Sequence, residues 1–298
     1  MKLLKRISTA ALLSMIIFLS VTRVHVSAAT VNITKEELQY FVRIKEKDTG
    51  KHPTVALYLG NRSIKEKAYL INDTTYIPLR TTTEIAGATV TYNANTRTAT
   101  VTMDGLYMTV TDGSYIIYAN ERPILSKTPA VILSDGRMYV PVRSIAKALS
   151  LDVEWLPSRE VILSGNATPL VHAKNYYRYD ELLWLSRIIS AESQGESLIG
   201  QIAVGNVVLN RVAHRDFPNS IYGVIFDRKH GIQFTPVANG TIYNEPTYTA
   251  TLAAKICLEG VSLNSNVLFF MEPNKSTSSW IKNNRKYAFS IQNHDFYY

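Results

Sequence analysis

The chain has 298 residues, of which 46% are hydrophobic and 19% are charged, a composition that excludes a disordered or collagen-like protein and a length that favours two domains. A single cysteine, Cys257, excludes an intramolecular disulfide framework and a structural zinc site built from cysteines. The formal net charge is +8, but no cluster of five basic residues occurs, so we expect no nucleic-acid partner.

Residues 1–28 are predicted to be an export signal. Three basic residues precede an uncharged run over 7–22, which is short for a membrane span. Val26-Ser27-Ala28 then provides the small residues that a signal peptidase requires. We therefore expect cleavage after residue 28, a secreted protein, and no stable membrane span afterwards; an uncleaved N-terminal anchor is the alternative.

Residues 54–165 alternate short apolar and polar runs with turn residues, which predicts short strands. Within them, the sequence over 74–92 is repeated over 136–155, and a Tyr-x-Pro motif stands at the same place in each copy. Each copy predicts a strand that ends at the proline, a short helix and a returning strand. The two copies are expected to share one core.

The duplicated segment resembles the domain family named after the copper amine oxidase N-terminal domain. That resemblance implies a wall-facing or structural module, so residues 54–165 are expected to contact wall polymer or wall protein. The repeats contain no histidine, and we expect no copper there.

Beyond the repeats, the pattern changes to helical spacing. Residues 166–178 lack periodicity and are predicted to be a linker. A helix is predicted to follow, with Asp180 as its N-cap and Gly195 as its end. The run over 202–213 is apolar on nearly every side, which predicts a buried helix, and another helix is expected over about 246–260. Strands and turns are expected from there to residue 298.

Glu192 is the candidate for acid–base chemistry. Helical spacing places it on the same face as Leu185, Ile188 and Ile189, at the end of a helix that faces the core. A carboxyl group in such a place is partly dehydrated, which raises its pKa and suits it to hold a proton at neutral pH. The alternative is an exposed glutamate at the edge of an amphipathic helix.

Six motifs follow one another in the second half of the chain. They are R-I-I-S-A-E-S-Q-G-E (187–196), G-Q-I-A-V-G-N-V-V-L-N-R-V (200–212), F-P-N-S-I-Y-G-V-I-F (217–226), Q-F-T-P-V-A-N-G-T-I-Y-N (233–244), S-S-W-I (278–281) and I-Q-N-H-D-F (291–296). This order resembles the SleB-type cell wall hydrolases, the spore cortex-lytic enzymes. The resemblance implies a lysozyme-like, lytic transglycosylase-like catalytic domain over 179–298. The predicted fold class is therefore α+β, a small duplicated strand and helix module followed by this domain.

The resemblance also implies a reaction. The glutamate of the A-E-S-x-G-E motif, here Glu192, would be the catalytic acid that cuts peptidoglycan glycan strands between N-acetylmuramic acid and N-acetylglucosamine. We expect a lytic transglycosylase that leaves anhydro-muramyl ends during lysis of cell wall or spore cortex, without a cofactor. One alternative is a hydrolytic muramidase with Glu272, Glu245 or Glu196 as a second carboxylate. Another is a wall-binding protein without catalysis.

Further site residues are expected within the same motifs. Where relatives commonly read Y-F-Y-N-P, this chain has F-F-M-E-P over 269–273, which removes two tyrosine hydroxyls and an amide. The six histidines show no metal-ligand spacing, so no metal site is expected. Stabilisation of loops is the alternative for the polar residues of the fourth motif. The residues predicted to bind substrate are Glu196, Gln233, Thr235, Asn239, Tyr243 and Trp280.

Overall fold

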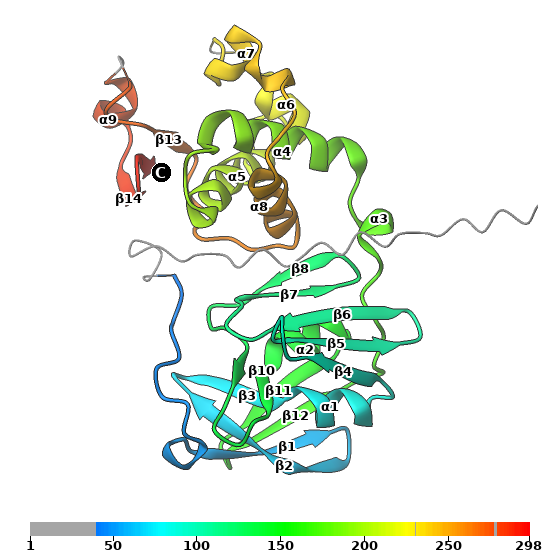
Figure 1. The fold of residues 1–298 in the computed structure, drawn as a ribbon. Coiled ribbons are helices and arrows are strands. Elements are labelled where there is room, and N and C mark those ends of the chain that lie inside the picture. Colours follow the sequence, from blue (N-terminus) through cyan, green and yellow to red (C-terminus); the bar gives the residue numbers. More distant parts are fainter. Residues whose placement is uncertain (1–39, 230, 277–278) are drawn as a thin grey trace, which may run out of the picture.

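The computed structural model describes residues 40–229, 231–276 and 279–298, so the export signal expected over 1–28 lies outside the described residues. Figure 1 shows a strand-rich module built from the earlier part of the chain and a mainly helical domain built from the later part. This arrangement confirms the α+β class. No helix in the described part of the chain is long and apolar enough to cross a membrane.

Seven strands form the larger sheet of the module, in the order β11-β12-β1-β2-β3-β10-β9. β1 runs parallel to β12, and the other neighbours are antiparallel. The sheet therefore joins the first and last strands of the module. After the short 3-10 turn η2 (Thr49–Lys51), its strands are β1 (Thr54–Leu59), β2 (Arg62–Ile71), β3 (Thr74–Pro78), β9 (Val131–Ile132), β10 (Met138–Pro141), β11 (Asp152–Leu156) and β12 (Glu160–Ser164).

The second sheet of the module is an antiparallel meander of five strands in sequence order. In its middle strand, Leu106, Met108 and Val110 are buried and the residues between them are more exposed, as an alternating strand requires. The strands are β4 (Thr89–Asn93), β5 (Thr98–Met103), β6 (Leu106–Thr111), β7 (Ile116–Ala119) and β8 (Arg122–Leu125).

The structure confirms the predicted duplication. The first copy forms β3, then α1 (Leu79–Ile85), then β4, and the second forms β10, then α2 (Val142–Ala148), then β11. β3 and β10 pair antiparallel with Ile77 opposite Val140, and both residues have no exposed surface. The two copies thus share one core, as their common sequence pattern predicts.

Three packed helices form the core of the second part. They are α4 (Tyr179–Ser193), α5 (Leu198–Ala213) and α8 (Tyr248–Leu258). A Cβ atom on Gly205 of α5 would lie 2.7 Å from the Ile189 side chain and 2.8 Å from the Cys257 sulfur, so glycine permits the close approach of these helices. Asp180 is not the N-cap, because α4 begins one residue earlier and Asp180 belongs to its first turn.

Short elements surround these helices. On one side lie α6 (Ile221–Ile225), α7 (Thr235–Asn239) and the 3-10 turn η3 (Thr241–Tyr243). On another lie a small sheet in the order β13-β15-β14 and the helix α9 (Trp280–Asn284). The strands of this sheet are β13 (Phe269–Met271), β14 (Tyr287–Ile291) and β15 (His294–Tyr297). The expected tail of strands and turns is confirmed.

The segment over 166–178 connects the two parts, and contacts on both sides hold it in place. It contains the short helix α3 (Ala173–Tyr176). On the module side, Asn120 donates its Nδ2 to the carbonyl oxygen of Leu170 at 2.6 Å. On the other side, the Tyr177 hydroxyl donates to Glu259 at 2.6 Å. The segment predicted to be a linker is therefore held by hydrogen bonds to both parts.

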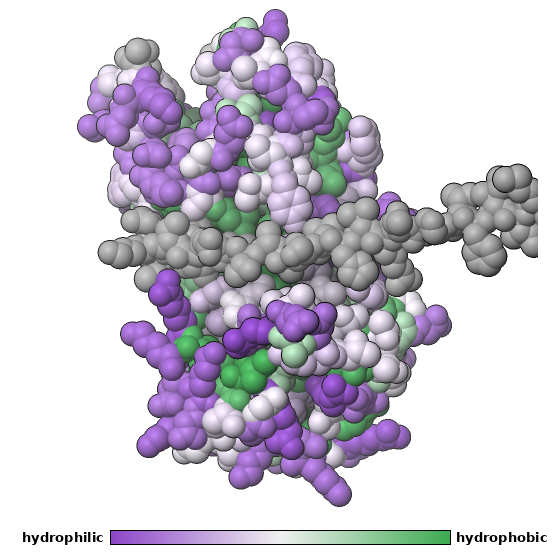
Figure 2. All heavy atoms as spheres, in the orientation of Figure 1, coloured by the Kyte–Doolittle hydropathy of each residue, from purple (hydrophilic) through white to green (hydrophobic). Residues whose placement is uncertain are grey.

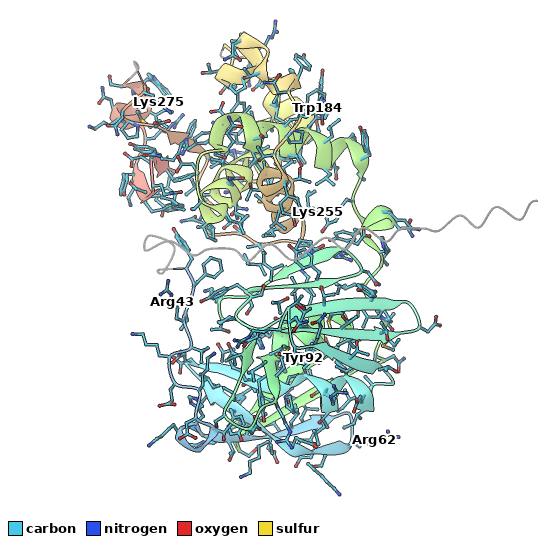
Figure 3. All side chains as sticks on the ribbon, viewed as in Figure 1. Arg43, Arg62, Tyr92, Trp184, Lys255 and Lys275 are labelled. Atoms are coloured by element: carbon cyan, nitrogen blue, oxygen red, sulfur yellow. The ribbon has the colours of Figure 1, made fainter. Side chains whose placement is uncertain are left out.

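A buried ionic cluster fastens the module to the helical domain. The Glu259 carboxylate, 1% exposed just after α8, accepts two hydrogen bonds from Arg122 of β8, at 2.7 and 2.9 Å. Lys147 of α2 lies 3.0 Å from the same carboxylate. Lys255, on the part of α8 near the module (Figure 3), lies 5.7 Å from the centre of the Tyr177 ring. Arg122 and Lys147 of the module therefore balance the negative charge of Glu259 in the helical domain.

Candidate active site

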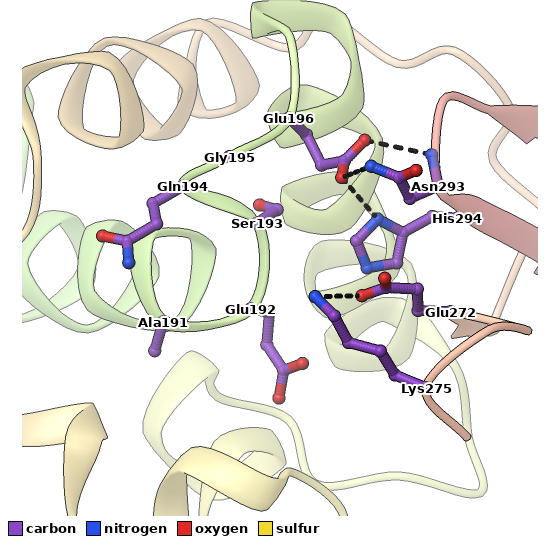
Figure 4. A pocket seen from close by; sticks show the side chains of 10 residues that line it. All are labelled: Ala191, Glu192, Ser193, Gln194, Gly195, Glu196, Glu272, Lys275, Asn293 and His294. Atoms are coloured by element: carbon purple, nitrogen blue, oxygen red, sulfur yellow. Dashed lines mark hydrogen bonds and ion pairs between the residues drawn. The ribbon is translucent and has the colours of Figure 1, made fainter.

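A pocket of about 330 Å³ lies at the C-terminal end of α4. Figure 4 shows that its lining comes from the last turn of α4, the connection to α5, the segment after β13 and the turn before β15. Glu192 and Glu196, both selected from the sequence, lie in this lining. The full set is Ala191, Glu192, Ser193, Gln194, Gly195, Glu196, Glu272, Lys275, Asn293 and His294.

Glu192 lies in the last turn of α4, on the face expected from the helical spacing. Ile188 and Ile189 on that face are fully buried, and Glu192 itself is half-buried. Burial raises the pKa of the Glu192 carboxyl from 4.5 to about 7, because the charged form is poorly hydrated there, and the charge of Arg211 opposes this rise. The half-buried position of Glu192 agrees with the partial dehydration expected from the sequence.

Arg211, in the last turn of α5, was not selected from the sequence. Its side chain is buried, and burial lowers its pKa from 12.5 to about 10, while the negative charges of Asp227 and Glu192 favour its charged form. A cation thus lies within electrostatic reach of the half-buried carboxyl. Arg211 is the only charged residue of a largely buried helix, and this was the signal that could have identified it.

Both carboxylate oxygens of Glu196 are held by the turn before β15. Asn293 donates its backbone N–H to one oxygen at 3.3 Å and its Nδ2 to the other at 2.9 Å. The Glu196 side chain is 6% exposed, and His294 Nδ1 lies 3.7 Å from it. Glu196 therefore joins the α4–α5 connection to the C-terminal sheet, and its predicted contact with substrate remains a prediction.

His294 forms part of the same wall. Its ring is 4% exposed, and burial lowers its pKa, with Glu196 and Glu272 acting in the opposite direction. A buried imidazole with a lowered pKa is mainly neutral at neutral pH. In Figure 4 the Glu192 carboxylate points away from the group formed by Glu196, Asn293 and His294, so these two sets of side chains face different parts of the pocket.

Glu272 also lines the pocket, although it stands at the departure from the family pattern. Its side chain is 21% exposed and lies 3.0 Å from Lys275 Nζ. The sequence offers Glu272 only as one of three alternatives for a second carboxylate. The structure brings this carboxylate to the same cavity as Glu192. Glu245, another proposed second acid, is 88% exposed, is absent from the lining and lies 3.7 Å from Arg187.

Five residues predicted to bind substrate are not part of this lining. α7 and η3 carry three of them, α9 carries another, and Gln233 lies just before α7. α9 stands apart from α7 in Figure 1, and Figure 2 shows a hollow in the surface between these regions. Two of the five form local hydrogen bonds, Gln233 to the carbonyl of Gly231 and Asn239 to Thr241, as loop stabilisation requires. Their role in binding stays a prediction. The five are Gln233, Thr235, Asn239, Tyr243 and Trp280.

Two amides of α5, one buried and one partly buried, support the segment that leads into β13. Asn206 donates to the carbonyl of Val261 at 2.8 Å and accepts from the N–H of Leu263. Asn210 donates to the carbonyls of Asn264 and Val267. The hydrogen bonds expected for these amides are present, and they fix the chain that leads into β13.

The geometry suits proton transfer better than metal chemistry. Among the described residues, no group of three histidine, cysteine or acidic side chains is placed to hold a metal ion. The Cys257 thiol is buried, and burial raises its pKa, so it is a poor nucleophile. The pocket offers one half-buried carboxyl that can both give and take a proton near neutral pH.

Comparison with known families matches two segments of the chain. Residues 195–297 match the family described as Cell Wall Hydrolase. Residues 58–163 match the Copper amine oxidase N-terminal domain family. Both matches agree with the resemblances seen in the sequence motifs.

Curated relatives include the spore cortex-lytic enzyme of Bacillus cereus, 38% identical over 107 residues, which are 36% of this chain and 40% of the relative. The spore cortex-lytic enzyme of Oceanobacillus iheyensis is 34% identical over 124 residues, 40% of this chain and 44% of the relative. The chain thus spans less than half the length of the curated relatives it matches.

Among solved structures, the catalytic domain of the germination-specific lytic transglycosylase SleB from Bacillus anthracis is similar to this chain. It is 36% identical, with a TM-score of 0.38, and the match covers 42% of this chain and 98% of that domain. The catalytic domain of the Bacillus cereus SleB protein is also 36% identical, with a TM-score of 0.37, and the match covers 42% of this chain and 94% of that domain.

Proposed function

Residues 195–297 belong to the cell wall hydrolase family, and on this premise we propose that the protein cleaves peptidoglycan glycan strands between N-acetylmuramic acid and N-acetylglucosamine. The observation that carries the proposal is the half-buried Glu192 in the pocket wall, with its pKa raised to about 7. A group with such a pKa can act as acid and as base at neutral pH. We propose action at the cell wall or spore cortex after export, because the curated relatives are spore cortex-lytic enzymes.

The reaction that we propose is a lytic transglycosylation. Protonated Glu192 gives its proton to the oxygen that links the two sugars, and the bond from that oxygen to C1 of the muramyl sugar breaks. The resulting carboxylate takes the proton of the muramyl 6-hydroxyl, whose oxygen bonds to C1 and closes an anhydro ring. No water is consumed, and Glu192 is protonated again at the end.

Product masses test this reaction. We expect fragments released from purified peptidoglycan by the full chain to end in anhydro-muramyl sugar, because the 6-hydroxyl replaces water as the acceptor. Mass spectrometry distinguishes such an end, which is lighter by one water than a reducing end. Reducing muramyl ends, shown to be present before any later processing, would contradict the transglycosylase reaction and leave glycan-strand cleavage intact.

A second candidate, hydrolytic muramidase chemistry, is favoured by one observation. Glu272 lines the same pocket as Glu192, and a hydrolytic glycosidase needs a second carboxylate to activate water or to act as nucleophile. The contact of Glu272 with Lys275 at 3.0 Å favours a structural role for this carboxylate, because the side chain is already engaged by a neighbouring residue.

Glu272→Gln separates the two reactions. We expect this variant to release fragments at a rate within about threefold of the original chain, because a transglycosylase needs a single acid and base. Release is measured on purified sacculi beside Glu245→Gln, an 88% exposed position that is absent from the pocket lining. A loss of about 10²-fold or more in Glu272→Gln alone would support hydrolysis instead.

A further inference from the structure

Arg211 is a buried cation whose charged form is favoured by the negative charges of Asp227 and of Glu192. We infer that Arg211 is a positioning residue that stabilises the Glu192 carboxylate between its two proton transfers. The inference rests on the proposed function, in which Glu192 passes through a charged state. A fixed positive charge favours that state and makes Glu192 a stronger acid for the first transfer.

Contacts from three segments hold the Arg211 guanidinium in place. Its Nε donates to the carbonyl oxygen of Leu268 at 2.7 Å, immediately before β13. Three aromatic rings surround its central carbon at 5.1, 5.2 and 5.3 Å, distances typical of cation–π contacts. One ring follows α5, one directly precedes α7, and one begins β13. These rings belong to Phe217, Phe234 and Phe269.

One nitrogen of this guanidinium lacks a partner. Arg211 is 5% exposed, and its Nη1 is buried without a hydrogen bond to any described residue. A buried charged N–H that stays unpaired lowers stability, so its retention calls for a functional reason. A carboxylate that forms only during the reaction provides that reason, because it adds a negative charge at the stage when the acid has lost its proton.

Other charged groups lie near Glu192 or Arg211. Asp227, from the segment after α6, acts on Arg211. The α4–α5 connection and the C-terminal sheet region contribute the other charged groups that line the pocket with Glu192. Arg211 is the group whose charge lowers the pKa of Glu192. The pocket groups are Glu196, Glu272, Lys275 and His294.

The pH dependence of fragment release tests the inference. The protonated acid is the active form, so activity falls as pH rises through the pKa of Glu192, about 7. We expect Arg211→Met to move this fall in activity, the basic limb of the pH profile, to higher pH by about one unit, because Glu192 loses a nearby positive charge. The rate on the acid side, where activity is constant, is expected to fall about tenfold, because protonated Glu192 becomes a weaker acid. Arg211→Lys keeps the positive charge, so the basic limb of its pH profile is expected to lie within about half a pH unit of that of the original chain.

Two more variants complete the test. Arg215→Met changes a 91% exposed arginine and is expected to leave the limb in place. Asp227→Asn removes a negative charge that competes for the guanidinium, so its limb is expected to move to lower pH. This variant leaves the aromatic contacts of Arg211 unchanged, so it decides the question even if circular dichroism shows that Arg211→Met does not fold.

A shift of the basic limb to higher pH in Arg211→Met and to lower pH in Asp227→Asn supports the role of Arg211. A purely structural residue would change the rate of release without moving the pH at which activity falls. An unmoved limb in Asp227→Asn, or in a folded Arg211→Met, overturns the inference if Glu192→Gln is inactive. An active Glu192→Gln would instead overturn the proposed function itself, because the limb would then belong to another group.

Discussion

Glu192→Gln is expected to lower the release of soluble fragments from peptidoglycan by about 10²–10⁴-fold. Glutamine has nearly the same size as glutamate, but it can neither protonate the leaving oxygen nor take the proton of the 6-hydroxyl. Release is measured by mass spectrometry on purified sacculi below pH 7, where Glu192 of the original chain is mainly protonated. Full retention of activity would contradict catalysis by Glu192, and retention of wall binding without any release by either chain would favour a wall-binding protein.

The stability of this variant shows whether its fold is intact. The pKa of Glu192 is raised from 4.5 to about 7 in the folded chain, so the folded state of the original chain loses stability as pH rises through this range. Glutamine does not titrate. We therefore expect Glu192→Gln to be more stable than the original chain above about pH 7 and equally stable in acid, as measured by urea unfolding.

Glu259→Ala is expected to lower the free energy of unfolding by about 3–5 kcal/mol, because it leaves the buried Arg122 guanidinium without its counter-charge. The Arg122 and Glu259 side chains are 6% and 1% exposed, so water cannot replace the lost contacts without opening the interface. Urea unfolding followed by circular dichroism measures the change. Glu245→Ala, at an 88% exposed position, is the control and is expected to change stability by less than about 1 kcal/mol.

This stabilisation depends on pH in a defined direction. Burial alone would raise the pKa of Glu259, but hydrogen bonds from Arg122, Tyr177 and Lys147 outweigh it and lower the pKa below 4.5. The contribution is therefore fully present above pH 4.5 and is lost as pH falls through the lower folded value. The difference between Glu259→Ala and the original chain is expected to shrink in acid; a constant difference would assign the loss to packing.

Local patterns predicted the repeated units well. Tyr-x-Pro predicted the junction of strand and helix in both copies, since proline is compatible with the start of a helix and not with its interior. The spacing of Leu185, Ile188 and Ile189 predicted the buried face of α4 and the dehydration of Glu192. In each case the signal lies within a few turns of one element.

Contacts between distant segments of the chain could not be predicted from the sequence. The sequence could not choose among Glu272, Glu245 and Glu196 as a second carboxylate, because the small C-terminal sheet is what brings Glu272 to the pocket of Glu192. Glu259 reads as a surface residue at a helix end, yet Arg122 and Lys147 from the module surround it. Such partners lie 80 or more residues apart in the chain, so no local pattern predicts their contact.

The sequence by itself determined the order of modules, the duplication of the first, the family motifs of the second and the carboxyl most suited to proton transfer, because each depends on residues close together in the chain. Only the tertiary structure decided which charges surround that carboxyl and what joins the two parts. Burial and electrostatic attraction act through space, so the surroundings of Arg211, Glu272 and Glu259 became visible only once the chain was folded.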